Sequence, residues 1–182
     1  VSYQRRIFPI DTENFTLSEI LCFLIILLFC VIILIKATRS HRIEKMQAIS
    51  VFLLVIYLGI VFGSTVFTRT PTTRRYKLFP FWSWVEVLMD LNKEQLKENL
   101  LNVILFIPMG ALQPFIADRK VRLPRAFLSG VLVSFVIEIC QLVSMRGLFE
   151  WDDMIHNGVG CVIGCAIGNF CFSIVQKKVS NP

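Results

Sequence analysis

Residues 154–176 read MIHNGVGCVIGCAIGNFCFSIVQ, one of the two longest runs without a charged side chain in the sequence. It contains no Asp, Glu, Lys or Arg over 23 residues, and a helix needs about 20 apolar residues to cross a bilayer. Gly160, Gly164 and Gly168 recur at intervals of four, which places them on one face of that helix. Small residues on one face allow a second helix to approach closely. The stretch therefore predicts a membrane-spanning helix that packs against another helix.

The composition extends this prediction to the whole chain. Its 182 residues are 55% hydrophobic and 18% charged, with a mean hydropathy of +0.66, whereas an ordinary soluble domain is about 25% charged. A soluble fold of this size could not bury so much apolar side chain, so the surplus must face lipid. The net charge is +6, but the basic residues lie in the gaps between apolar runs. This distribution is typical of a membrane protein and argues against nucleic acid as a partner.

Four further apolar runs are long enough to span a bilayer, namely 17–35, 49–68, 99–117 and 126–144. We therefore predict an all-α, polytopic membrane helix bundle of about five transmembrane helices, forming a single domain over residues 1–182. The cysteines lie inside apolar runs, so we expect buried thiols rather than disulfides or metal ligands. No P-loop, dinucleotide fingerprint or zincin motif occurs, and we expect no cofactor and no metal.

The longest connection, residues 69–98, lies between the second and third predicted spans. It begins with four basic residues, Arg69, Arg74, Arg75 and Lys77. An aromatic cluster, FPFWSW, follows at 79–84, and Trp at this density is typical of a membrane interface. We expect Trp82 and Trp84 to anchor the loop. Apolar residues then alternate with charges, which predicts a short interfacial amphipathic helix over 85–98.

Basic residues divide almost evenly between the two sides of the membrane, nine against ten. The short first and third connections carry them most densely, and dense basic loops favour the cytoplasmic side. We therefore predict that the N-terminus lies outside and the C-terminus in the cytoplasm.

Polar residues of the predicted spans gather at one end of the bundle. Because successive helices alternate in direction, the ends of the second and fourth spans and the starts of the third and fifth fall on the same side. A charge in the bilayer interior costs roughly 2.5–3.5 kcal/mol on insertion scales, so these groups need a reason to be there. The candidate binding residues are Arg69, Arg74, Arg75, Asn102, Glu138, Gln141, Arg146, Asp152, Asp153 and Asn157.

Two compatible interpretations of this cluster follow from the residues. The carboxylates and arginines could form a structural network that ties the helix ends together. They could also bind an amphipathic ligand, because arginine near a membrane surface favours phosphate or carboxylate groups. A catalytic carboxylate pair would need a metal or a nucleophile, and His156 beside Asp152 and Asp153 is only a weak metal signal. We therefore predict no catalytic residue.

Four motifs occur in a fixed order along the chain. They are FPF at 79–81, NVILFIPMG at 102–110, EICQ at 138–141, and Arg146 followed by FEWDDMIHNGVG at 149–160. Together they resemble the VanZ-like family of bacterial membrane proteins, and the similarity is strongest over 51–170. Two positions depart from the family's usual pattern, because Lys77 stands where Asn is usual and Glu150 where Asp is usual.

The resemblance implies a multi-pass protein of the bacterial plasma membrane that is associated with resistance to teicoplanin, a glycopeptide antibiotic with an acyl chain. We expect the polar cluster to bind an amphipathic molecule near the outer membrane surface. The candidates are the lipoglycopeptide and two kinds of membrane lipid, namely a lipid-linked cell-wall precursor and a phospholipid. The arginines would contact its head group, and the carboxylates and amides would hold the arginines in place.

Three alternatives belong to other functional classes. The first is a membrane enzyme that acts on a lipid head group, with Glu138 or Asp153 as acid or base. The second is a lipid transporter, which would need a polar path through the membrane; we expect the inner halves of the helices to be apolar. The third is a structural partner in a wall-synthesis complex.

Overall fold

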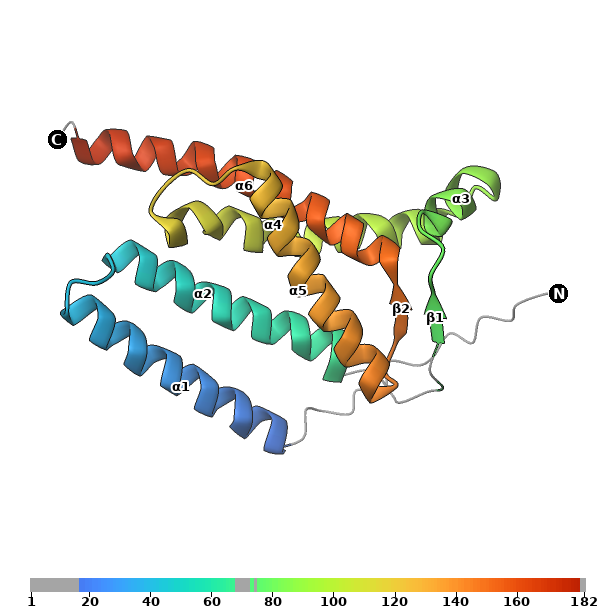
Figure 1. The fold of residues 1–182 in the computed structure, drawn as a ribbon, viewed down its shortest axis with the longest axis horizontal. Helices are drawn as coiled ribbons and strands as arrows, with labels where there is room; N and C mark the ends of the chain where they lie inside the picture. The colour runs from blue at the N-terminus through green and yellow to red at the C-terminus, as the bar shows by residue number, and fades with distance from the viewer. Residues whose placement is uncertain (1–16, 68–72, 74, 181–182) are drawn as a thin grey trace.

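The computed structural model describes residues 17–67, 73 and 75–180 (Figure 1). Five of its helices are long and apolar enough to cross a membrane. These are α1 (Leu17–Arg39), α2 (Lys45–Phe62) with its π-helical continuation η1 (Gly63–Phe67), α4 (Lys93–Ala117), α5 (Leu123–Ser144) and α6 (Trp151–Ser180). The prediction of an all-α polytopic bundle with five spans is confirmed.

Local signals explain where several of these helices begin and end. A capping box precedes α2, in which the side chains of Glu44 and Gln47 bond reciprocally to backbone N–H groups. The polypeptide turns after α4 and α5 at Asp118 and Met145, whose positive φ angles of 50° and 57° stop the helical hydrogen-bond pattern. Pro124 lies in the first turn of α5, where its missing N–H is not needed. For the start of α1 the sequence predicts a capping box of Thr16 with Glu19, but Thr16 lies outside the described residues.

The amphipathic helix predicted over 85–98 is wrong in its bounds, because the chain breaks there. A short helix, α3 (Trp82–Met89), ends with Asp90 as its C-cap, and α4 begins at Lys93. Leu91 has a φ of 49°, which interrupts the helical path. Asn92 then caps α4 by accepting a hydrogen bond from the backbone N–H of Gln95 (3.1 Å). The polar start of α4 is therefore a continuation of a membrane span rather than part of a surface helix.

The glycines of α6 allow it to lie directly on α4, as the spacing predicts. A Cβ atom on each of three α6 glycines would collide with a carbonyl oxygen of α4, the pairs being Gly160 with Val103, Gly164 with Ile107 and Gly168 with Ala111. The contact is reciprocal, since a Cβ on Gly110 would collide with the carbonyl oxygen of Cys161. The structure thus identifies α4 as the partner, with backbone meeting backbone over two turns of helix.

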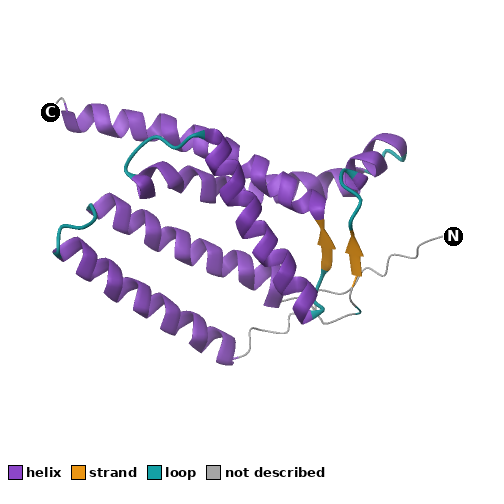
Figure 2. Ribbon diagram, in the orientation of Figure 1, coloured by secondary structure: helices purple, strands orange, loops and turns teal. Residues whose placement is uncertain are grey.

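Two very short strands add a feature that the sequence did not predict. The strand β1 (Arg75–Lys77) pairs in parallel with β2 (Leu148–Glu150), and Lys77 lies opposite Glu150 in the register (Figure 2). Three residues are too few for an alternating apolar pattern to be recognised. This pairing holds the long loop against the connection between α5 and α6.

Candidate functional site

The polar end of the bundle is built by β1, β2 and α3 together with the starts of α4 and α6 and the end of α5 (Figure 1). Seven candidate residues lie in or beside these segments: Asn102, Glu138, Gln141, Arg146, Asp152, Asp153 and Asn157. Arg69 and Arg74 lie outside the described residues, and only the backbone of Arg75 is described, in β1. The contacts below therefore concern the carboxylates and amides of the cluster.

Asp152 on α6 caps the short helix α3 from a distance. Its side chain is 1% exposed and accepts hydrogen bonds from Phe81 N (2.5 Å), Ser83 N (2.9 Å) and Ser83 Oγ (2.5 Å). Phe81, at the N-cap position with a φ of 62°, has no side-chain acceptor of its own. The Asp152 carboxyl group supplies that acceptor at the end of the helix where a negative charge is favourable. All of these contacts fix α3 to α6.

A chain of hydrogen bonds leads from α4 to the same carboxyl group. Gln95 Nε2 donates to Asn99 Oδ1 (3.2 Å), and Asn99 Nδ2 donates to Ser83 Oγ (3.2 Å). The single hydroxyl proton of Ser83 is donated to Asp152, so Ser83 Oγ can only accept from Asn99. The donor and the acceptor of each hydrogen bond in this series are therefore fixed. Ser83 and Gln95 are not among the site residues predicted from the sequence. A signal was present, since the α4 residues Asn92, Gln95, Asn99 and Asn102 follow spacings of three, four and three, which form one polar stripe.

The two tryptophans of the loop contact protein groups as well as facing outward. Trp84 Nε1 donates to Nε2 of the buried His156 (2.8 Å). Lys77 Nζ lies 2.8 Å from the centroid of the Trp82 ring and 3.5 Å from Glu86 Oε1. Both tryptophans belong to α3. Trp84 therefore attaches α3 to α6, and Trp82 attaches α3 to β1. Whether the tryptophans also anchor the loop in the membrane interface stays a prediction.

The remaining amides and carboxylates form pairs that tie different elements together. Asn102 Nδ2 on α4 donates to Asp153 Oδ1 on α6 (2.6 Å). Glu138, 3% exposed on α5, accepts from the backbone N–H of Glu150 in β2 (3.0 Å). Two further bonds join Gln141 Nε2 to the Thr65 carbonyl oxygen (2.9 Å) and Asn157 Nδ2 to Ser134 Oγ (2.7 Å). These described contacts favour a structural network at the core of the cluster.

Among the described acids outside the membrane spans, Glu150 has the most strongly shifted pKa. Burial, and after it the negative charge of Asp153, raise the pKa of Glu150 from 4.5 to about 8. Lys77, its register partner across the sheet, acts in the opposite direction. The two positions that depart from the family pattern thus face each other. A carboxyl group with a pKa near neutrality can hold or release a proton under physiological conditions.

The expectation that the inner halves of the helices are apolar is wrong. Gln113 Nε2 on α4 donates to Ser129 Oγ on α5 (2.6 Å) and to Cys161 Sγ on α6 (3.1 Å). Nearer that end, Asn169 bonds to both the N–H (2.9 Å) and the carbonyl oxygen (2.8 Å) of Val121. Each polar group is tolerated because it finds a partner on a neighbouring helix or loop. The Gln113 bonds join α4 to α5 and α6. The Asn169 bonds hold the connection between α4 and α5 against α6.

No group of three or more His, Cys, Asp or Glu side chains able to hold a metal ion occurs among the residues that the structure describes. The described side chains at the polar end are hydrogen-bonding and acid–base groups.

Five membrane-spanning helices with a buried polar cluster at one end define a multi-pass membrane protein. The family model described as VanZ/LLP1 matches residues 20–172, so the chain belongs to the VanZ/LLP1 family. The match begins within α1 and ends within α6, so it includes the first four spans and most of the fifth. No curated protein and no solved structure matches the chain.

Proposed function

We propose that this VanZ-family protein lowers susceptibility to teicoplanin by binding an amphipathic molecule at the polar end of the bundle. The molecule is the lipoglycopeptide, a lipid-linked wall precursor or a phospholipid. In this proposal the polar end faces the outside of a bacterial plasma membrane and the C-terminus lies in the cytoplasm. The family membership supports the link to teicoplanin.

The observation that carries the proposal is that a polar rim and an exposed apolar surface occur at the same end of the bundle. Asp153, Arg146 and Glu150 are partly exposed there, and α3 is bonded to Asp152, the residue before Asp153. The outward side of the loop and α3 is strongly apolar, with Phe79 71%, Leu88 72% and Met89 79% exposed. A molecule with a charged head and an acyl chain matches both halves of this surface.

The described contacts divide the candidate residues into a frame and a rim. Asp152 and Glu138 are buried and bonded to α3 and β2, so they shape the surface without reaching a ligand. Asp153 and Arg146 are partly exposed and are the residues we expect to contact the head group, together with Arg69, Arg74 and Arg75. Asn102, Gln141 and Asn157 hold the supporting helices.

Teicoplanin susceptibility in a host that expresses the chain tests this proposal, with vancomycin as the antibiotic control. Asp153→Asn removes a charge but keeps an oxygen that can accept the bond from Asn102. Asp118→Asn makes the same change at the exposed turn after α4, at the opposite end, where Asn tolerates the positive φ. We expect protection against teicoplanin alone, lost in Asp153→Asn and retained in Asp118→Asn at matched membrane levels. Equal protection by both variants would remove Asp153 from the site.

Direct binding separates a site from an indirect effect on the cell. Purified protein in detergent should bind teicoplanin more tightly than vancomycin, and Asp153→Asn should weaken only that binding. If wild-type protein protects cells but binds neither antibiotic, a lipid-linked precursor or phospholipid is the ligand to test next with the same pair of variants.

The raised pKa of Glu150 favours one second candidate, an enzyme that acts on a lipid head group. Glu150, rather than the buried Glu138, would then be the proton donor or acceptor, with Asp153 beside it. Incubation of purified protein with head-group-labelled phospholipid tests this. Release of label that disappears in Glu150→Gln supports the enzyme, and no release by wild-type protein contradicts it.

A further inference from the structure

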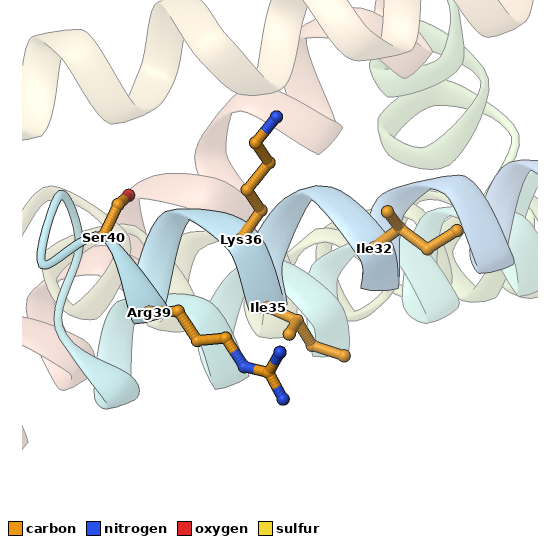
Figure 3. A pocket seen from close by; sticks show the side chains of 5 residues that line it. All are labelled: Ile32, Ile35, Lys36, Arg39 and Ser40. Carbon is orange, nitrogen blue, oxygen red and sulfur yellow. The ribbon is translucent and has the colours of Figure 1, made fainter.

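At the end of the bundle opposite Asp152, the last turns of α1 lie between two hollows. The first has a volume of about 490 Å³ and is lined by Ile32, Ile35, Lys36, Arg39 and Ser40 (Figure 3). The second, of about 390 Å³, lies between α1 and α2, and its lining is almost entirely apolar, including Leu34, Ile49 and Phe52. Ile35 and Arg39 line both hollows, so the two flank a single helix end.

The charged side chains that line the two hollows are cationic. Lys36 and Arg39 lie three residues apart and line the same hollow, and in Figure 3 their side chains diverge, with Arg39 running back along the helix toward Ile35. Neither cation forms a salt bridge with a carboxylate that the structure describes. Arg42 and Lys45 follow in the chain, against a single acid, Glu44, over residues 36–45. Two cations that pair with no described carboxylate therefore line the hollows at this helix end.

This arrangement matches the chemistry of a lipid with a negatively charged head group. We propose that the end of α1 binds an anionic phospholipid, whose phosphate lies at Lys36 and Arg39 and one of whose acyl chains lies in the hollow between α1 and α2. Phosphate attracts both cations, and the hollow offers an acyl chain closer contact than a smooth helix surface does. The ligand comes from the leaflet at the same end as the C-terminus, away from the polar cluster.

Charge favours a lipid over a second copy of this chain as the occupant. A symmetric contact between two copies uses the same surface on both, so it would bring a second set of Lys36 and Arg39 to the same face. Those like charges would repel unless an anion lay between them. A phospholipid supplies the missing negative charge and the apolar chain in one molecule.

Lipid binding to the full-length chain, measured by native mass spectrometry in detergent, tests the proposal. The probes are phosphatidylglycerol and phosphatidylcholine with identical acyl chains. We expect one phosphatidylglycerol to bind more tightly than phosphatidylcholine. Lys36→Gln combined with Arg39→Gln should abolish that preference, at about fivefold per cation. Lys36→Arg with Arg39→Lys should keep it, because the charges remain.

The matched control removes two other cations from the same end of the molecule. Lys177 and Lys178 lie in the last turn of α6, so Lys177→Gln with Lys178→Gln causes the same charge loss away from the hollows. We expect that pair to leave the preference intact. Equal binding of the two lipids by wild-type protein would overturn the proposal, as would an equal loss of preference in the test and control pairs.

A further variant tests the acyl-chain part. Ala48 lines the hollow between α1 and α2, so Ala48→Leu fills part of it. We expect weaker binding of both lipids, with the preference for phosphatidylglycerol retained, in protein whose Tm matches that of wild type. Unchanged binding by this variant would show that no acyl chain lies there. A lipid-free dimer whose formation excludes phosphatidylglycerol would identify a second copy as the occupant.

Discussion

Helices α1 and α6 are both long enough to cross the membrane, yet they occupy opposite places in the fold. None of the residues of the α1 span Ile20–Arg39 is buried within the protein, whereas 39% of those in the most apolar part of α6 are. The more hydrophobic helix is therefore the peripheral one. Lipid is as apolar as a leucine side chain, so apolar residues gain little by facing protein. Small residues gain close helix contact by facing protein, and polar residues gain hydrogen-bond partners. Helix α6 is rich in both kinds of residue.

The largest expected effect comes from breaking the contact that makes α6 central. In Gly164→Leu the added side chain would overlap the Ile107 carbonyl oxygen, and backbone can move away only if the helices separate. We expect a cost of about 3 kcal/mol or more, which lowers the Tm in detergent by roughly 10 °C. Ala166→Leu adds similar bulk at an exposed α6 position and should change little. Similar melting of the two variants would contradict the glycine contact.

The second largest loss of stability should come from removing the cap that Asp152 of α6 provides for α3. In Asp152→Asn the amide nitrogen replaces one acceptor, so Phe81 N–H or Ser83 loses its partner. We expect a loss of about 1–3 kcal/mol. Hydrogen exchange should rise in α3 before it rises in α5, because α3 depends on this side chain for its cap. Asp118→Asn serves as the control. Unchanged exchange in α3 would show that other contacts suffice to hold it.

The pH dependence of stability should be a smaller difference with a defined sign. Between pH 4.5 and about 8 the folded protein keeps the proton on Glu150, while the unfolded chain releases it. The folded state then binds more protons, so this group's contribution to stability falls as the pH rises through that window and is constant above it. We expect the Tm advantage of Glu150→Gln over wild type to grow from pH 4.5 to 8. Parallel Tm curves would refute the raised pKa.

The smallest effect should come from α1. Phe29 is 65% exposed on that helix, so Phe29→Ala removes few contacts within the protein. We expect a change in the free energy of unfolding within about 0.5 kcal/mol, and no measurable shift in Tm. A loss comparable to that of Gly164→Leu would mean that α1 packs against a partner and that the contrast with α6 does not hold in the assembled protein.

Much of the fold could be predicted because membrane insertion depends on local composition. The uncharged run at 154–176 and its glycine spacing predicted both a span and a close helix contact, and the structure confirms both. The prediction of one amphipathic helix over 85–98 failed because the apolar pattern continues through Leu91, where the backbone turns. A positive φ at Leu91 has no signature in the hydrophobic pattern.

The candidate site could be predicted as a set of residues but not as a set of partners. Alternation of the spans is enough to bring Asp152, Asp153 and Glu138 to one end. It does not say that Asp152 caps α3, because that bond joins residues 69 positions apart through the orientation of two helices. The role of Ser83 was missed for the same reason, since a serine within an aromatic run has no meaning until its neighbour is known.

By itself the sequence determined the membrane class, the five spans, the end at which the polar residues gather and the resemblance to the VanZ family. Those properties follow from hydropathy over windows comparable to the bilayer thickness and from short ordered motifs. The packed fold was needed to show that α4 is the partner of α6, that Lys77 faces Glu150, and that α1 lies at the periphery. Such choices depend on which distant surfaces fit and which polar groups find partners, and both are properties of the packed helices rather than of any one segment.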